Sequence, residues 1–462
     1  MKKALACVVL AAGQGTRMKS TIPKVLHKLN GIPMIHYVLR ALSGLGPERV
    51  IVVVGRDNGN ALKEALKSED VRLALQKTPL GTAHALMSAG KALRGFHGDI
   101  LVLNGDTPLV SAMTLRKFIT KHRRARKSLS LLSFVAGDPT GYGRILRDRS
   151  DIPLGIREER DATEEEKAIN EVNSGIYLFK PQALTLLKKI GLNSKKGEYY
   201  LTDILEIASQ KGLGCGVYCS GDEREFMGIN TTEELLRAQR ILREKTVRYW
   251  LERDVSFMDE TSVYIHPEVV IGEGTHIYPN VYLEGKTSIG SGCVIYPDVR
   301  ITDSTIGDGV TIKDSSVIES AEIQGNTIIG PFARLRPGAR IMKDARIGNF
   351  VEVKASTIGE GAKAQHLSYI GDADVGKNVN IGAGTITCNY DGVKKHRTVI
   401  EEGVFIGSDT QLVAPVRVEK GAYVGAGSTV TRDVPAGALA ISRSQERHIK
   451  GWAKKMKKKK QR

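Results

Sequence analysis

The chain has 462 residues, of which 41% are hydrophobic and 5% aromatic, so two compact domains with aliphatic cores are expected and a disordered chain is excluded. No run approaches the roughly 20 apolar residues of a membrane helix, and the first residues lack the apolar core and cleavage site of a secretion signal. We therefore expect a cytoplasmic protein without membrane insertion. The formal charge of +17 invites a nucleic-acid interpretation, but much of the excess lies between Arg443 and Arg462, a run typical of a solvated terminus.

Strands and helices alternate in the first part of the chain. Short β-branched runs predict buried parallel strands at residues 4–10, 49–55, 71–76 and 99–103. Composition and length predict helices between them, at residues 33–43, 61–68, 82–93 and 112–126. This order predicts a Rossmann-like α/β domain, residues 1–230, with ligands at the carboxyl ends of its strands.

A charged amphipathic segment, residues 231–254, follows and predicts a helix, which is either a linker between domains or an ordinary packed helix of the first domain. We assign it as a helical linker. Beyond it, aliphatic residues recur about every six positions, with a few shortened steps, as in Ile306, Ile312, Val317, Ile323 and Ile329. A six-residue period is the signature of a parallel β-helix, in which the aliphatic residue of each unit points inward. We assign residues 255–440 to this fold and residues 441–462 to a basic tail.

Charged and glycine-rich motifs in the first domain predict a phosphate site. The run LAAGQGTRM (10–18) follows a strand, and its glycines allow backbone N–H groups to approach a phosphate. Arg17 and Lys24 add cations, which phosphoryl transfer requires. Asp106 ends the last predicted strand, a position suited to Mg²⁺.

The repeat domain carries a second candidate site. Arg336 and Lys354 lie eighteen positions apart, about one turn of such a coil, so they are expected to stack on one face. His366 lies twelve positions further on, short of a full turn, at an edge of the same groove, where it can act as a base. The segment CNYDGVKKHR (388–397) interrupts the repeat, and such insertions commonly form binding loops.

Further motifs in the same order make the chain similar to a known family. They are PKVLH (23–27), LGTAHA (80–85), NGDTP (104–108), TGYGRI (140–145), EVNSGI (171–176), GEYYLTDI (197–204) and GIN (228–230). With LAAGQGTRM they resemble the sugar-1-phosphate nucleotidyltransferases. Together with the repeat half, nearly the whole chain resembles the bifunctional N-acetylglucosamine-1-phosphate uridyltransferases and glucosamine-1-phosphate N-acetyltransferases.

The resemblance implies two reactions and their ligands. Acetyl-CoA acetylates glucosamine-1-phosphate in the C-terminal domain, and UTP then reacts with N-acetylglucosamine-1-phosphate in the N-terminal domain, with Mg²⁺ as cofactor and pyrophosphate released. It also implies a left-handed coil and a homotrimer with acetyl-CoA sites between subunits.

The resemblance further assigns residues to these ligands. Mg²⁺ binds Asp106 and Asn230, and the catalytic residues are Arg17, Lys24 and His366. The uridine contacts are Leu10, Ala11, Ala12, Gly13, Gln76, Gly81 and Thr82, and the sugar contacts are Gly143, Glu158, Asn173 and Asn230. Glucosamine phosphate binds Arg336, Lys354, Tyr369, Asn380 and Lys395, and acetyl-CoA binds Ala383, Asn389, Tyr390, Ser408, Ala426 and Arg443, with Asn389 and Tyr390 also touching the sugar.

Two alternatives and one departure stand beside this interpretation. Pro79 stands where the family often has a polar residue, so position 79 is not among the predicted uracil contacts. A monofunctional nucleotidyltransferase with a structural β-helix would have no use for His366, Lys354 and the insertion together. A nucleic-acid-binding protein would need interleaved aromatic residues beside its lysines, which the tail lacks.

The five scattered cysteines favour reduced thiols over disulfides or a zinc site.

Overall fold

The computed structural model describes residues 4–13, 15–193 and 197–460, so Gln14 of the glycine-rich run and the last two residues of the expected tail lie outside the described residues. The chain divides into two compact units, Met1–Leu242 and Arg243–Arg462. Helix α7 (Thr232–Leu251) spans this division, close to the expected linker. Its Ala238 is buried in a core of the first unit, and its Trp250 is buried in the core of the second.

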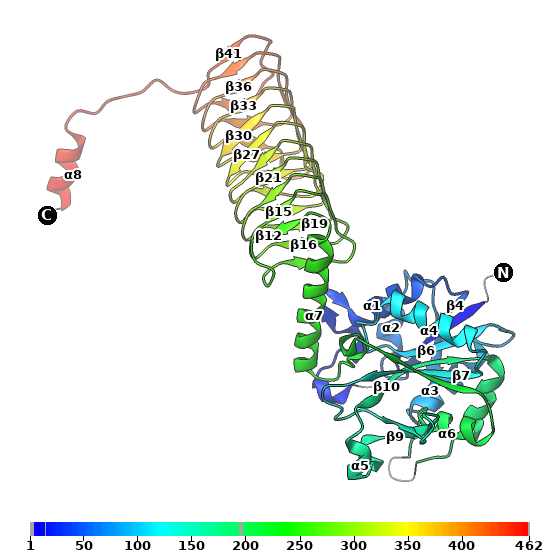
Figure 1. Cartoon of the computed structure of the whole chain (residues 1–462). Helices are drawn as coiled ribbons and strands as arrows, with labels where there is room; N and C mark the ends of the chain where they lie inside the picture. The colour runs from blue at the N-terminus through cyan, green and yellow to red at the C-terminus, as the bar shows by residue number, and fades with distance from the viewer. Residues whose placement is uncertain (1–3, 14, 194–196, 461–462) are drawn as a thin grey trace. The chain divides into compact units, whose positions relative to one another are not determined.

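The first unit is built on a mixed sheet with the strand order β11-β7-β10-β6-β1-β4-β5 (Figure 1). Strands β1, β4, β5 and β6 are parallel neighbours, and their positions confirm the four predicted strands. Strand β10 runs antiparallel to β6 and β7, which the sequence did not predict. The strands are β1 (Leu5–Leu10), β4 (Arg49–Gly55), β5 (Arg72–Gln76), β6 (Asp99–Asn104), β7 (Leu129–Val135), β10 (Glu171–Phe179) and β11 (Cys215–Ser220), with β8 (Arg144–Arg147) and β9 (Pro153–Arg157) at the side.

Helices cover both faces of this sheet because alternate strand residues point to opposite sides. On β1, Val8 belongs to one core, with Leu86 of α3 and Ile204 of α6, whereas Val9 belongs to the other, with Val38 of α1. Helices therefore cover both faces of the sheet, and the carboxyl ends of the strands are the edge at which ligands can bind. The helices are α1 (Met34–Ser43), α2 (Gly59–Ala65), α3 (Thr82–Ser88), α4 (Ala112–Arg124), α5 (Glu164–Lys167) and α6 (Asp203–Gln210), and a short hairpin, β2 (Lys28–Leu29) and β3 (Ile32–Pro33), precedes α1.

The second unit is a parallel β-helix of short strands stacked in three sheets, seen as the regular coil in Figure 1. The first sheet runs from β12 (Ser256–Phe257) to β41 (Leu439–Ala440), the second from β13 (Tyr264–Ile265) to β40 (Thr429–Val430), and the third from β14 (Val270–Ile271) to β38 (Val416–Val418). The predicted inward residues fill one continuous aliphatic core, with one exception. Val317 is only half-buried, and its neighbour Ile318 is fully buried and pairs with Ile301. The shortened step therefore falls between Ile318 and Ile323, one repeat later than predicted.

Nine strands of the coil carry or adjoin the second group of candidate residues. In the first sheet these are β27 (Arg346–Asn349), β30 (Lys363–His366), β33 (Asn380–Ile381), β36 (Phe405–Ile406) and β39 (Tyr423–Val424). In the second sheet they are β25 (Arg334–Leu335), β28 (Glu352–Lys354), β31 (Tyr369–Gly371) and β34 (Ile386–Cys388). The predicted insertion lies between β34 and β35 (Thr398–Ile400), and its Val393 is 82% exposed.

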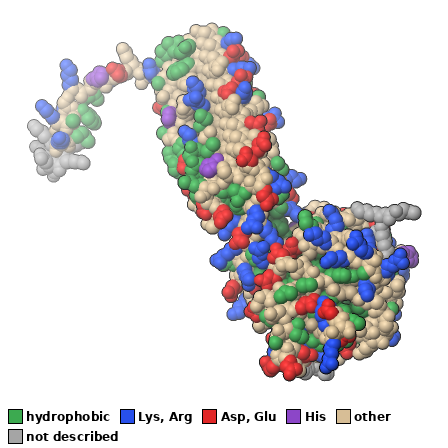
Figure 2. Space-filling view, viewed as in Figure 1, with side chains coloured by type: hydrophobic (Ala, Val, Ile, Leu, Met, Phe, Trp, Pro, Cys, Tyr) green, Lys and Arg blue, Asp and Glu red, His purple; other side chains and the backbone are tan. Residues whose placement is uncertain are grey.

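The surface of the coiled unit differs from one side to the other in Figure 2, where hydrophobic side chains gather along one edge and charged side chains along the other. The described chain ends in helix α8 (Trp452–Lys460). None of the helices within the described ranges combines the length and apolar composition needed to cross a bilayer. All five cysteines are free thiols, as predicted.

Candidate active sites

A cavity of about 930 Å³ opens at the carboxyl ends of β1 and β6 in the first unit. It collects most of the residues predicted for the uridyltransferase site. The predicted residues that line it are Leu10, Ala11, Ala12, Gly13, Arg17, Lys24, Gln76, Gly81, Thr82, Asp106 and Glu158. Pro79 also lines it, although the sequence analysis set that position aside. Gly143 and Asn173 do not line the cavity, but they adjoin each other, since the Asn173 N–H donates to the Gly143 carbonyl at 2.8 Å.

The glycine-rich loop is shaped to let Lys24 approach it. Gly15 has a positive φ of 65°, and a Cβ on it would lie 2.5 Å from the Cβ of Lys24. Any other residue at position 15 would be strained and would displace Lys24. The loop therefore fixes this lysine at the cavity.

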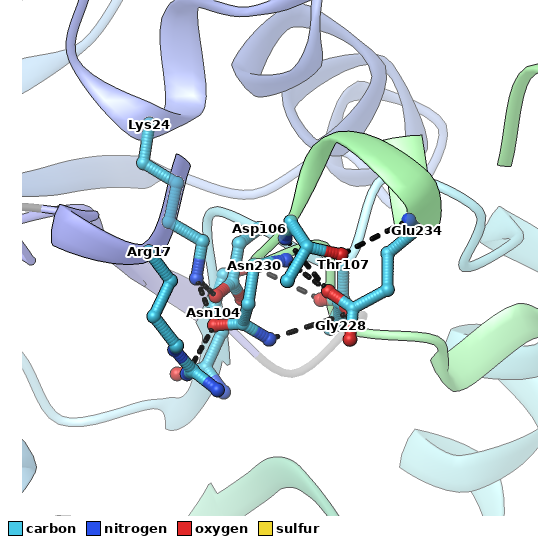
Figure 3. Close-up of polar contacts among 9 residues, drawn as sticks. Arg17, Lys24, Asn104, Asp106, Thr107, Gly228, Asn230 and Glu234 are labelled. Atoms are coloured by element: carbon cyan, nitrogen blue, oxygen red, sulfur yellow. Dashed lines mark hydrogen bonds and ion pairs between the residues drawn. The ribbon is translucent and has the colours of Figure 1, made fainter. Parts of the chain in front are cut away.

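Two cations and two oxygen ligands meet beside this loop (Figure 3). The Lys24 ammonium donates to the Asp106 carboxylate and, at 2.6 Å, to the side-chain oxygen of Asn230. The Arg17 guanidinium donates to the same Asn230 oxygen at 2.8 Å. The structure thus brings together four of the predicted residues, from segments more than 200 positions apart.

Helix capping positions Asn230. Thr231 caps α7, because its hydroxyl accepts from the Glu234 N–H at 3.1 Å and the Glu234 carboxylate accepts in return from the Thr231 N–H at 2.9 Å. The same carboxylate accepts from the N–H of Asn230 (Figure 3). The Ile229 N–H donates to the Asp106 carbonyl at 2.9 Å, so the start of α7 is tied to the end of β6.

The donor set fits Mg²⁺. Asp106 and Asn230 offer a carboxylate and an amide oxygen that converge on one cation, and hard oxygen ligands are those that Mg²⁺ prefers. Within the described ranges, no cluster of three or more His, Cys, Asp or Glu side chains forms a metal site. Mg²⁺ commonly takes one or two protein carboxylates and completes its shell with water and phosphate oxygens, so two protein ligands suffice.

The motif at residues 197–204 is clamped to the motif at residues 80–85. Gly81 has a φ of 93°, and a Cβ on it would lie 2.6 Å from the Tyr199 carbonyl. The Thr82 hydroxyl accepts from the Leu201 N–H at 3.0 Å, and the Gln76 amide donates to the Gly81 carbonyl at 3.1 Å. These contacts hold Gln76, Gly81 and Thr82 as one wall of the cavity.

The acidic part of the cavity was only partly predicted. Glu158 was predicted, and its carboxylate accepts from the Thr202 hydroxyl at 2.9 Å. The sequence analysis missed several further lining residues, which are Gly15, Val25, Ala85, Asn104, Gly141, Glu159, Arg160, Asp161, Glu198 and Tyr200. Burial, reinforced by the nearby Glu158 and Glu206 carboxylates, raises the pKa of Asp203. The run REERD (157–161), five charged residues at the end of a strand, is the signal that could have identified this wall.

In the second unit, Arg336 and Lys354 stack on neighbouring turns, as predicted. Their strands pair Leu335 with Val353, and the Arg336 N–H donates to the Val353 carbonyl at 2.9 Å. The Arg336 guanidinium also donates to Glu352 at 2.8 Å.

The insertion brings a third cation to this face. The Lys395 ammonium lies against that of Lys354 and lowers the pKa of Lys354, with smaller contributions from desolvation and from Arg336. The insertion closes as a turn, because Asp391 accepts from the N–H groups of Val393 and Lys394 and from His396, contacts that hold the pKa of Asp391 well below its usual range. Three clustered cations suit the binding of a phosphate group.

Tyr369 and Asn389 converge beside these cations. A Cβ on Gly371 would collide with the Tyr369 hydroxyl and lie 2.8 Å from the Asn389 amide nitrogen. Asn389 is 7% exposed and donates to the Asp372 carboxylate. Tyr390 points outward and is 61% exposed. Asn380 lies apart, on β33 in the first sheet.

The structure places His366 on β30, in a different sheet from Lys354. Strand register continues from β30 through β33, β36 and β39, so His366 heads a column that also contains Ala383, Ser408 and Ala426. The Asp409 N–H donates to the Ala383 carbonyl at 2.7 Å, and the Arg443 guanidinium donates to the Ala426 carbonyl at 2.8 Å. The predicted base therefore lies in line with three of the residues predicted to bind acetyl-CoA, and a fourth, Arg443, contacts this column.

Family comparisons agree with these two halves. The MobA-like NTP transferase domain matches residues 7–165, and the bacterial transferase hexapeptide (six repeats) matches residues 397–432. The GMPPB C-terminal domain matches residues 260–339. These matches confirm the predicted fold class, a Rossmann-like nucleotidyltransferase domain followed by a left-handed β-helix of hexapeptide repeats.

Relatives match the chain over nearly its whole length. Proteins named "Bifunctional protein GlmU" are 51% identical in Thermodesulfovibrio yellowstonii, over 98% of this chain and 99% of the relative, and 46% identical in Pelobacter propionicus, with the same coverage. The protein of that name in Geotalea uraniireducens is 45% identical, again over 98% and 99% of the two chains. The predicted family and the predicted pairing of a uridyltransferase with an acetyltransferase are thereby confirmed. The chain belongs to the family of bifunctional GlmU proteins.

Proposed function

We propose that uridylyl transfer takes place in the cavity of the first unit, with Asp106 and Asn230 as the Mg²⁺ ligands. The observation that carries this proposal is the convergence of both oxygens on Lys24, beside Arg17. A cavity with fixed cations from one loop and carboxylates from another segment suits a ligand with phosphates at one end and hydroxyl groups at the other.

The reaction is a displacement. A phosphate oxygen of N-acetylglucosamine-1-phosphate attacks the α-phosphorus of UTP, the bond to the bridging oxygen breaks, and pyrophosphate leaves with the electron pair. Mg²⁺ neutralises phosphate charge when it is bound. Arg17 and Lys24 bind phosphate oxygens and neutralise charge as it develops, and the backbone at residues 10–13, with Gln76, Gly81 and Thr82, orients the nucleotide. Glu158, Asn173, Gly143 and Asn230 orient the sugar.

Acetyl transfer is proposed on the coiled unit. Arg336, Lys354 and Lys395 bind the phosphate of glucosamine-1-phosphate, and Tyr369, Asn380, Asn389 and Tyr390 orient the sugar. The amine nitrogen attacks the thioester carbonyl carbon of acetyl-CoA, the carbon–sulfur bond breaks, and coenzyme A leaves as the thiolate and takes up a proton. His366 accepts the proton that the nitrogen loses. Acetyl-CoA binds along Ala383, Ser408, Ala426 and Arg443, with Asn389 and Tyr390.

The chain is proposed to act as a homotrimer in the cytoplasm. The sugar-phosphate group and the acetyl-CoA column lie on different sheets of one chain, which supports sites completed by a second copy. Phe332, Phe350 and Leu367 lie at corners of successive turns and are 49%, 55% and 61% exposed, a surface suited to self-association. UTP and acetyl-CoA are cytoplasmic metabolites. Light scattering of the purified chain tests the trimer.

A coupled assay tests both reactions. Wild type, Asp106→Ala and His366→Ala are each given glucosamine-1-phosphate, acetyl-CoA and UTP, and the acetylated intermediate and the final nucleotide sugar are both followed. Asp106→Ala is expected to accumulate acetylated sugar phosphate, and His366→Ala is expected to use only sugar phosphate supplied already acetylated. Acetyl transfer at the wild-type rate by His366→Ala would contradict the proposed base.

A further inference from the structure

The ring of His366 has a partner that the reaction scheme above does not use. The side-chain oxygen of Asn349 lies 2.8 Å from the Nδ1 atom of His366, on the neighbouring turn. The two residues are paired across β27 and β30, and each of these strands has four residues where many strands of the same sheet have two. The extra residues bring Asn349 and His366 into register at the end of the pair.

The backbone is shaped for this contact. A Cβ on Gly348 would collide with the Gln365 carbonyl, so the two strands approach more closely here than a side chain at position 348 would allow. The Leu367 N–H donates to the Asn349 carbonyl at 3.0 Å, so the ladder is held by the backbone without help from the two side chains.

The contact selects one form of the imidazole ring. An amide oxygen only accepts, so the Nδ1 atom of His366 must carry the hydrogen, and the lone pair of neutral imidazole is then on Nε2. We propose that Asn349 is a positioning residue for acetyl transfer, which holds His366 in the tautomer and orientation that present Nε2 to the substrate amine. This inference rests on the proposed role of His366 as the base.

A purely structural role fits the contact less well. His366 is exposed and Asn349 is half-buried, and a hydrogen bond in such a setting contributes only about 1 kcal/mol or less to stability. The charged side chains on the two paired strands are Arg346 and Lys363, and β33 on the other side begins with the uncharged Asn380. An amide is therefore the group that directs the ring without adding charge to it.

The test compares Asn349→Leu and Asn349→Asp in the full chain. With Asn349→Leu, the kcat of acetyl transfer is expected to fall about tenfold or more, with the KM for glucosamine-1-phosphate nearly unchanged. Nitrogen-15 NMR of the unliganded protein is expected to show a mixture of His366 tautomers in place of one. Asn349→Asp keeps the acceptor, so it should restore the single tautomer and most of the rate, with the pH–rate profile displaced to higher pH because a carboxylate stabilises imidazolium.

Controls separate this inference from the proposed base and from misfolding. Ser256→Ala removes a similar contact on the same sheet, 2.7 Å from the Nδ1 of His276, and should leave both reactions unchanged. Uridylyl transfer should be unaffected in every variant. An unchanged kcat and an unchanged tautomer in Asn349→Leu would overturn the inference, as would an Asn349→Asp variant as slow as Asn349→Leu. Failure of the base itself is seen separately, as acetyl transfer that survives His366→Ala.

Discussion

The Lys24 ammonium contacts the Asp106 carboxylate, and this lysine is held in place by the loop around Gly15. Lys24, which is proposed to bind phosphate, thus contacts Asp106, which is proposed to bind the metal ion. Mg²⁺ bound at the proposed ligand Asp106 would displace Lys24 toward the phosphates, so metal and nucleotide should assist each other's binding.

Metal dependence is therefore expected for one reaction only. Removal of Mg²⁺ with EDTA should abolish uridylyl transfer and leave acetyl transfer unchanged, measured as pyrophosphate and free thiol released by the same preparation. Asp106→Asn, which keeps the shape and removes the charge, should lower the kcat/KM of uridylyl transfer about a hundredfold or more. Acetyl transfer that needs Mg²⁺ would contradict the separation of the two sites.

Capping of α7 should matter for catalysis as well as for stability. Glu234→Ala removes the carboxylate that accepts from the N–H groups of Asn230 and Thr231, so it should lower the free energy of unfolding by about 1 kcal/mol. It should also raise the Mg²⁺ concentration needed for half-maximal uridylyl transfer, because Asn230 is no longer held toward Asp106. The matched control is Glu233→Ala, an exposed acidic residue in the same turn, which should change neither quantity.

Much of this arrangement is readable in the sequence because it is local or periodic. The β-branched runs gave four strands of the first sheet, and the six-residue period gave the coil. The period failed at Val317 because Ile318 beside it is equally aliphatic, and only pairing with Ile301 on the previous turn separates them. Long-range relationships were harder to foresee.

The partner of His366 illustrates what limits such predictions. Asn349 lies seventeen positions before His366, which is one turn of this part of the coil. The length of the turn therefore indicates that the two residues are neighbours. The prediction counted from Lys354 instead and expected both residues in one groove. A distance of twelve residues is two-thirds of a turn, which moves the chain to another sheet.

Gly371 should be essential for the second reaction. A Cβ at this position collides with the Tyr369 hydroxyl and crowds the Asn389 amide, so Gly371→Ala should displace both side chains. Acetyl transfer should fall about tenfold or more, while uridylyl transfer in the same protein serves as the control for folding. Gly221→Ala, at a position with open space around the added carbon, is the matched substitution and should be silent.

Binding of glucosamine-1-phosphate should weaken at high pH earlier than an isolated lysine would predict. Lys395 lowers the pKa of Lys354, so Lys354 loses its proton, and its charge, at a lower pH than usual. The KM for glucosamine-1-phosphate should therefore rise as the pH rises through that range. Lys395→Met removes the like charge, which raises the pKa of Lys354 and moves this rise to higher pH, although the KM at neutral pH increases because one cation is lost.

The control for that experiment is in the same insertion. Lys394→Met removes an exposed cation that is not among the groups that shift the pKa of Lys354. The pH at which the KM rises should therefore stay where it is in the wild type. A Lys395→Met variant whose profile coincides with that of Lys394→Met would show that the two ammonium groups are not coupled.

Two truncations divide the tail by function. Arg443 donates to the Ala426 carbonyl at the end of the proposed acetyl-CoA column, whereas α8 begins nine residues later. A chain ending at Ala440 should show a KM for acetyl-CoA raised about tenfold, because the proposed charge-assisted contact of Arg443 with the coenzyme is lost. A chain ending at Lys450 keeps Arg443 and should bind acetyl-CoA normally. If the longer truncation product were as impaired as the shorter one, the coenzyme would depend on α8 and its lysines instead of Arg443.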